Sequence, residues 1–324
     1  MPTVINTSTS VGSGTGSAST KPNAYYDKLL LELLVQTNFS HDRFAQERDM
    51  PAKAGDTINF RKINTLTPSL EPLTEGVTPD GLNGGLTAIT ATSHAYGEWM
   101  LFSDMVDVTT VDPIITEYTV ELARIMREKL DILVREELNG GSNVVYAGGK
   151  TSRDALTASD KPTIDDLRRI VLTLKKNFVK PAMGNKYVAF VTPDVSFDLQ
   201  DDEKFLKAYE IGQNNTPMIE GEIANIYGMH FIELNNAKVF EAGEAGNHPT
   251  LDVHSTIVLG RKPYGITKIK GHGTVETITK GLGSAGTTDP LNQRQSIGAK
   301  IRAFGVKRLY EEAIVRYESV PTNA

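Results

Sequence analysis

The chain contains no cysteine, only one tryptophan, and no apolar run long enough to cross a membrane. The absence of cysteine excludes disulfide frameworks, thiolate zinc sites, iron–sulfur clusters and thiol catalysis, and it is typical of proteins from a reducing, intracellular environment. The densest apolar run, Leu29 to Val35, is short and contains Glu32. The first six residues have neither the basic nor the apolar region of a secretory signal. We therefore expect no secretory signal and no membrane span.

Motifs for catalysis are also scarce. No GxxxxGK[ST], HExxH, GxSxG or EF-hand loop occurs, and the six histidines are scattered singly. Residues 281–286, GLGSAG, match GxGxxG, but the following residues 287–290 do not begin a helix that could hold a pyrophosphate, so we interpret the segment as a flexible glycine loop. The consecutive carboxylates of residues 201–203 do not converge on a helix, which favours a solvated helix start over a cation site. We expect no cofactor and no metal.

One histidine–carboxylate pair needs separate consideration. Asp252 and His254 lie two residues apart, and on a strand this spacing places both on one face, where they could act as a base and the group that orients it. No nucleophile motif accompanies them, so we interpret the pair as structural. A cytosolic α/β hydrolase or transferase that uses Asp252 and His254 remains an alternative function.

Charge is unevenly distributed along the 324 residues, whose net charge is -6. Residues 260–324 carry eleven Lys/Arg and five Asp/Glu, a net +6 that leaves -12 for the rest. This asymmetry suggests head-to-tail packing between copies or a basic face toward a polyanion. The basic residues form dyads and never a longer run, and the net charge is acidic, which argues against tight or sequence-specific binding of nucleic acid.

The first part of the chain predicts extended structure. Residues 7–20 are almost entirely Ser, Thr and Gly and predict a mobile arm, followed by a helix from Ala24 to near Asn38. Residues 56–63 alternate polar and apolar, and residues 87–102 are rich in β-branched and aromatic side chains. The Pro- and Gly-rich residues 64–85 lie between them, so the pattern predicts one long hairpin with an elaborated tip, a feature that usually acts outside its own domain.

The remainder mixes helices and strands. Residues 113–139 form the strongest predicted helix, with Asp112 as N-cap, Pro113 at the first position and Gly140-Gly141 as the stop. Its apolar stripe and its length of roughly 40 Å are those of a helix that spans a domain. A second helix begins after Thr163, and residues 196–211 predict a third. The predicted strands are residues 186–191, 228–233, 256–259, 297–303 and 313–317.

The order of these parts resembles the major capsid proteins of tailed bacteriophages, which have the Hong Kong 97-like fold. Four segments are similar to the coat proteins of podophages of the N-four kind, and residues 289–298, DPLNQRQSIG, are the most specific of them. The other three are residues 24–28 (AYYDK), 51–57 (PAKAGDT) and 73–79 (LTEGVTP). The resemblance covers roughly residues 24–320.

The resemblance implies an α+β Hong Kong 97-like layout of named parts. These are an N-terminal arm at residues 1–55 with 1–23 flexible, an extended hairpin loop at 56–103, a peripheral domain at 104–184 with spine helix 113–139, an axial domain at 185–260, and a return at 261–324 in which 289–320 finish the peripheral sheet.

It also implies a function and partners. The chain is expected to be a non-enzymatic major capsid protein, assembled in the host bacterial cytoplasm into the icosahedral shell of the virion. Its partners would be other copies in hexamers and pentamers, scaffolding, portal and possibly decoration proteins, and packaged DNA bound without specificity. Only about twenty-three residues precede the resemblance, so a separate scaffolding protein is expected. An encapsulin-like compartment shell is the alternative that keeps the fold.

Subunit-interface candidates are drawn from the hairpin and the basic C-terminal strand. Aromatic side chains often dominate interfaces, and the hairpin carries five Asp/Glu against two basic residues over 56–98, which could meet basic residues of a neighbour. The competing interpretation is that half of the aromatic residues face the chain's own core. The candidates are Phe60, Arg61, Glu71, Glu75, Tyr96, Trp99, Phe102, Arg294, Lys300 and Arg302.

Overall fold

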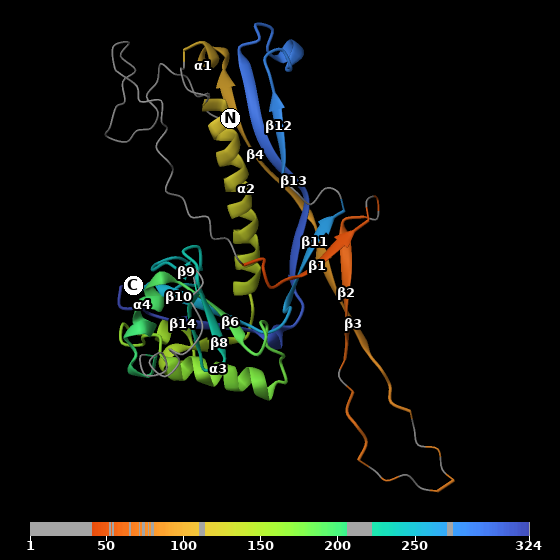
Figure 1. Ribbon diagram of the computed structural model, residues 1–324, viewed down its shortest axis with the longest axis vertical. Coiled ribbons are helices and arrows are strands. Elements are labelled where there is room, and N and C mark those ends of the chain that lie inside the picture. The colour runs from red at the N-terminus through yellow and green to blue at the C-terminus, as the bar shows by residue number, and fades with distance from the viewer. Residues whose placement is uncertain are drawn as a thin grey trace.

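The computed structural model describes residues 41–323 except 52, 54, 65, 71, 73, 74, 77, 79, 80, 110–113, 206–221 and 271–274. The predicted arm of residues 7–20, the helix of residues 24–38 and the N-cap Asp112 therefore lie outside the described residues. The described residues form two large sheets, a long helix, several shorter helices and a protruding hairpin (Figure 1).

A five-stranded sheet lies beside the long helix α2 (Ile114–Asn139), as Figure 1 shows. The 15-residue strand β13 organises it, with β4 on one edge and with β11 and β12 sharing the other. The strand β1 pairs in parallel with β11. The strands are β1 (Gln46–Met50), β4 (His94–Ser103), β11 (Tyr264–Ile269), β12 (Glu276–Lys280) and β13 (Arg294–Arg308), and the short helix α1 (Asp104–Thr109) follows β4.

A seven-stranded mixed sheet forms the second layer, in the order β5-β14-β10-β6-β8-β7 with β9 on β10. The helices α3 (Ile164–Lys176) and α4 (Pro193–Asp201) contribute apolar side chains to one of its faces. The strands are β5 (Val144–Tyr146), β6 (Tyr187–Val191), β7 (Glu222–Ile226), β8 (Met229–Glu233), β9 (Val239–Phe240), β10 (Val253–Leu259) and β14 (Ile314–Ser319).

Strand β6 shows how the two sheets become one body. All five of its residues are buried, which explains why its sequence is apolar without alternation. Tyr187, Ala189 and Val191 join the core under α3, whereas Val188 and Phe190 face the other way and join a core that contains residues of α2, β4 and β13. Since successive side chains of a strand point to opposite faces, this one strand connects both cores.

The hairpin predicted from the alternating pattern is confirmed. Strand β2 (Thr57–Ile63) pairs antiparallel with β3 (Leu86–Thr92) in a separate two-stranded sheet, and the residues between them extend away from the body (Figure 1). The predicted second strand of the hairpin is too long, because β4 leaves the hairpin at Ser93 and pairs with β13 instead. Phe60 packs with Ala91 and Leu309 and holds the base of the hairpin against the body.

Other elements agree with the predicted ones except at particular ends. Helix α2 ends at Asn139, just before the glycine pair, and Thr163 caps α3 by accepting a hydrogen bond from the Asp166 amide at 3.3 Å. Helix α4 begins at Pro193 rather than at residue 196, because Thr192 caps it, and it ends at 201; residues 206–211 of the prediction lie outside the described residues.

The expected return of residues 289–320 to one sheet is split in the structure. Strand β13 joins the sheet beside α2, but β14 pairs with β10 and β5 in the seven-stranded sheet. Burial gives the reason, because Ile314 and Val315 face the two different cores that this second sheet separates.

Candidate assembly surfaces

The hairpin exposes apolar side chains that no described part of the chain covers. A two-stranded ribbon cannot form a core of its own, so such side chains are expected at contacts with another molecule. Leu70 is the clearest case, with 93% of its surface exposed. The exposed apolar side chains of the hairpin are Ile63, Leu66, Leu70, Leu82 and Leu86.

The aromatic interface candidates separate into two groups. Phe60 and Phe102 are buried in the chain's own core, and the Phe102 ring lies 5.6 Å from that of Tyr118 on α2. Tyr96 is half-buried against the same core, whereas Trp99 is 54% exposed. Three of the four aromatic candidates therefore contact the chain's own core at least in part, and Trp99 is the one that offers most of its surface.

Trp99 lies in a groove of about 460 Å³ on the five-stranded sheet. Gly97 and Gly298 line the groove and have no side chains to fill it. A Cβ added at Gly298 would lie 3.4 Å from the Trp99 Cβ, and one added at Gly97 would lie 3.3 Å from the Ala299 carbonyl oxygen. Ile278, 41% exposed, forms the apolar part of the groove together with Trp99. Lysines 280 and 300 line its edges.

Only some of the charged interface candidates are exposed and free of ion pairs with the described residues. Arg61, Glu75, Arg294 and Lys300 are exposed, and Arg294 and Lys300 form no ion pair with the described residues, while Glu71 lies outside them. Arg302 is paired within the chain, with its Nε 2.9 Å from Glu276 Oε2.

The other basic residues of the C-terminal strand are also paired within the chain. Glu137 lies 3.5 Å from Lys307 and 3.7 Å from Arg308. Part of the positive charge of this strand is therefore neutralised inside the subunit. This was not evident from the sequence, because Glu137 is remote from the strand in the chain.

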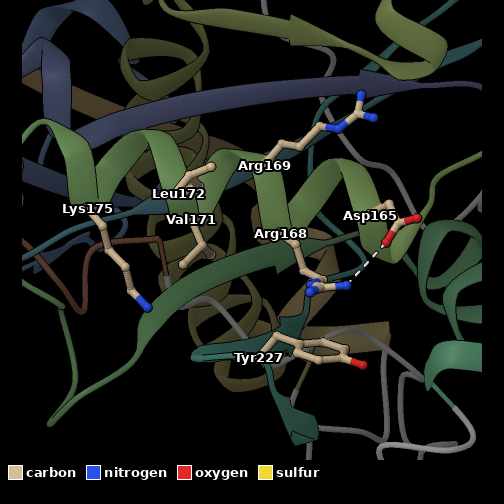
Figure 2. A pocket seen from close by; sticks show the side chains of 7 residues that line it. All are labelled: Asp165, Arg168, Arg169, Val171, Leu172, Lys175 and Tyr227. Carbon is tan, nitrogen blue, oxygen red and sulfur yellow. Dashed lines mark hydrogen bonds and ion pairs between the residues drawn. The ribbon is translucent and has the colours of Figure 1, made fainter.

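A second groove, of about 520 Å³, runs along α3 beside the turn between β7 and β8. Figure 2 shows Arg168 and Lys175 on the side of the helix that faces Tyr227. The Arg168 guanidinium lies 4.6 Å from the centre of the Tyr227 ring, and its Nη1 lies 3.5 Å from Asp165 Oδ1. A hydrogen bond from Lys204 lowers the pKa of Asp165 below its ordinary value. The groove is thus cationic with an apolar floor.

The Asp252–His254 pair does not form a catalytic dyad. Asp252 Oδ1 accepts a hydrogen bond from the Ala242 amide at 2.7 Å, and His254 Nδ1 lies 2.8 Å from Thr192 Oγ1. Burial lowers the pKa of His254, which favours the neutral ring. Asp252 thus holds the backbone at Ala242 and His254 contacts the side chain that caps α4, which supports the structural interpretation.

The structure also bears on the glycine loop, on metal binding and on membrane-spanning helices. Residues 281–286 lie between β12 and β13 and lead into a short 3₁₀ turn, Gly286–Thr288, so no helix begins there to hold a phosphate. Among the described residues there is no group of three or more His, Asp or Glu placed to hold a metal ion. Within the same residues, no helix is both long and apolar enough to span a membrane.

Two buried polar clusters were missed from the sequence. Glu318, with a fully buried side chain, lies 2.8 Å from both Arg153 and Arg316. His41 and Asp131 meet under α2, with His41 Nδ1 2.7 Å from Asp131 Oδ2. Arg153 and Glu318 are 165 residues apart in the chain, and His41 and Asp131 are 90 apart, so neither pair could be seen in the sequence. Only Arg316 and Glu318, two residues apart on one face of a strand, have a spacing that predicts a contact.

The body combines a long helix, two sheets and a protruding hairpin whose apolar side chains are not covered by the described residues. Among solved structures, the chain is similar to the capsid of Ralstonia phage GP4, with a TM-score of 0.71, 14% identity, and coverage of 97% of this chain and 98% of that one. It is also similar to the cyanophage Pam1 capsid, with a TM-score of 0.69, 13% identity, and coverage of 97% and 100%. A bacterial shell, the SrpI encapsulin of Synechococcus elongatus PCC 7942, has a TM-score of 0.56 at 12% identity, with coverage of 93% and 94%.

Sequence comparison identifies the family. The profile of the phage capsid protein family matches residues 87–317, most of the chain, and the chain belongs to that family. No match is found among curated protein sequences. The chain is therefore a major capsid protein, a structural protein of the bacteriophage virion that self-assembles into the icosahedral capsid shell.

Proposed function

We propose that the chain builds the shell from pentamers and hexamers, without enzymatic activity, and that it belongs to the podophage branch of the N-four kind. The observation that carries the assembly proposal is the hairpin, whose exposed leucines have no partner among the described residues of the chain. A neighbouring subunit would cover them and remove this apolar surface from water. The assignment to this podophage branch rests on the similarity of residues 289–298 to its coat proteins.

The domain division is part of the same proposal. The sheet beside α2 together with α2 would be the peripheral domain, and the seven-stranded sheet with α3 and α4 would be the axial domain, whose outer end would surround the symmetry axes. This division differs from the sequence boundaries in several respects. Strands β5 and β14 pair with the axial strands, α3 packs on the same sheet, and β4 leaves the predicted loop to pair with β13. The hairpin would reach from one subunit onto the next.

Assembly would take place in the host cytoplasm with a scaffolding protein and a portal, and the shell would enclose DNA without specific contacts. A chain of net charge -6 has no strong general attraction for phosphate, so the genome would be retained by the closed shell and by counterions. Decoration proteins would be additional partners.

The direct test is size-exclusion chromatography and negative-stain electron microscopy of the expressed chain, alone and with its neighbouring open reading frames. Shells, or rings of five and six subunits, are the expected result, and a homogeneous monomer in both preparations would contradict the proposal. A matched variant replaces residues 66–82 by a short Gly-Ser turn, which leaves β2 and β3 intact. This variant should fold as a monomer with unchanged stability and fail to form shells.

The hairpin charges allow a second test. Reversal of Glu71 and Glu75 to Lys should weaken assembly at low salt and have less effect at high salt, because exposed charges are screened. Unchanged assembly at low salt would contradict a contact between the hairpin and a basic surface of its neighbour.

An encapsulin-like compartment shell is the second candidate, favoured only by the lower similarity to the SrpI encapsulin. The contents of purified particles distinguish the two functions. Packaged DNA together with portal and terminase genes near the coding sequence indicates a virus, whereas an enclosed enzyme indicates a compartment.

A further inference from the structure

Helix α4 presents an exposed aromatic side chain between acidic residues. Phe197 is 63% exposed, and Asp194 and Asp201 lie three residues before and four residues after it. Residues at these spacings share one face of a helix, so one carboxylate lies on each side of the ring along the helix axis. Asp194 keeps 41% of its side-chain exposure, and its Oδ2 lies 3.9 Å from Nδ1 of the buried His254. Asp201 forms no ion pair with the described residues. A large exposed aromatic side chain with flanking carboxylates is a feature of a contact surface rather than of a solvated helix.

Helix α3 presents the complementary pattern in the groove of Figure 2. Leu172 is 52% exposed, and Arg168 and Lys175 lie four residues before and three residues after it. Val171 and Tyr227 complete the apolar part of the groove. Lys175 forms no ion pair with the described residues, and Arg168 is held only by an exposed pair with Asp165 and by its stacking on Tyr227.

The two patterns match in spacing as well as in charge. Both the acidic pair and the basic pair are seven residues apart, which corresponds to about 10.5 Å along each helix. An apolar residue stands between the members of each pair, Phe197 in one and Leu172 in the other. When the two helices lie side by side, two ion pairs can flank one apolar contact.

The two surfaces lie on different helices whose ends meet, since Asp202 Oδ2, just after α4, accepts a hydrogen bond from the amide of Ile164, the first residue of α3, at 3.1 Å. The groove lies at the turn that leads from the edge strand β7 into β8. Both helices bond to the C-terminal part of the chain. Asp198 Oδ2 on α4 accepts a hydrogen bond from the Thr322 amide at 2.7 Å, and Asp166 Oδ2 on α3 accepts one from the Tyr317 hydroxyl at 3.3 Å. Two different surfaces that fit each other generate head-to-tail contacts, and these close into a ring when the rotation permits.

We infer that α4 of one subunit packs into the α3 groove of the next copy of this chain, with Phe197 against Val171, Leu172 and Tyr227 and with Asp194 and Asp201 facing Arg168 and Lys175. This contact rests on the proposed function, since it would join neighbours within a pentamer or hexamer. It assigns to the second sheet a role in subunit contact that does not involve the hairpin.

The absence of native cysteine permits a direct test by cross-linking. The variant that carries both Phe197→Cys and Leu172→Cys is assembled and treated with a short bifunctional maleimide, and the products are separated by denaturing electrophoresis. A head-to-tail contact yields a ladder that ends at the closed ring, because every subunit offers both partners. Each single variant should remain largely monomeric. The matched control combines Phe197→Cys with Val120→Cys, an exposed position on α2 outside both surfaces.

Charge reversal tests the same contact without cysteines. Asp201→Lys should raise the concentration needed for half-maximal assembly about tenfold at low salt, since an attraction between opposite charges becomes a repulsion between like charges. A second reversal should restore assembly, either Lys175→Glu if the helices are parallel or Arg168→Glu if they are antiparallel. Lys176→Glu, on the same helix but outside the groove, should not restore it.

The outcomes separate this contact from the function on which it rests. Shells that form normally but give no more ladder than the control, together with the absence of rescue by either reversal, would overturn the contact and leave the capsid function intact. Absence of any particle from the unsubstituted chain would overturn both. If Phe197→Cys itself prevents assembly, the presence or absence of rescue in the charge series decides.

Discussion

Replacement of Glu318 by glutamine tests whether the buried charge cluster stabilises the subunit. The Glu318 carboxylate accepts hydrogen bonds from Nε and Nη2 of Arg153, both at 2.8 Å, and its Oε1 lies 2.8 Å from Arg316 Nε. The Arg153 guanidinium also lies 3.5 Å from the centre of the Phe240 ring. The hydrogen bonds to Glu318 raise the pKa of Arg153, whereas burial lowers the pKa of Arg316. Glutamine keeps the shape and removes the carboxylate charge that both arginines face.

The expected loss of stability follows from the burial of the three side chains. Breaking a buried ion pair by removal of one partner costs about 3–5 kcal/mol. Because the side chains of Arg153 and Arg316 keep 15% and 13% of their exposure, water can partly solvate them, and we expect about 3 kcal/mol, the lower end of that range. With an unfolding entropy of about 2 cal/mol/K per residue, this change lowers Tm by about 4 °C for a chain of 324 residues.

The assay is thermal unfolding of the unassembled subunit followed by calorimetry or circular dichroism. Glu312→Gln is the matched control, because Glu312 is 58% exposed and its partner Lys62 lies 3.4 Å away. This control should change the free energy of unfolding by less than about 0.5 kcal/mol. Equal Tm values for the two variants would refute the conclusion that the buried cluster stabilises the fold as a set of compensated charges.

Three further predictions concern other contacts. Gly265→Ala should destabilise the subunit by about 1–3 kcal/mol and speed hydrogen exchange in β2, because the new Cβ would lie 2.5 Å from Cζ of Phe60 at the hairpin base; unchanged exchange would contradict this. Asp131→Asn should cost about 1–3 kcal/mol, since the carboxylate accepts a hydrogen bond from the His41 amide at 3.0 Å and contacts its ring, and limited proteolysis near residue 41 should become faster rather than stay the same. The lowered pKa of His254 means that the unfolded chain binds a proton first as pH falls below about 6.5, so stability should decrease there; His254→Gln should reduce that decrease, and an identical pH profile would contradict the assignment.

Local chemistry along the chain determined much of the secondary structure. The cap at Thr163, the glycine stop after Asn139 and the continuous apolar run of β6 were all predictable, because each depends on neighbours within a few residues. The hairpin was predictable as well, since alternation and turn residues specify antiparallel pairing between adjacent segments. The phage capsid family was also within reach, because the order of parts along the chain resembles that of its members.

Only the tertiary structure decided which strands share a sheet and which side chains remain available to a neighbour. The departure of β4 from the hairpin and the placement of β14 beside β10 depend on the fit of side chains into two cores, which no local pattern specifies. The same holds for Phe60 and Phe102, which the sequence could not distinguish from the exposed Trp99. It also holds for the grooves of α3 and of Trp99, whose walls come from segments far apart in the chain. Sequence determined the elements because their energetics are local, and the fold decided the surfaces because burial is a property of the whole molecule.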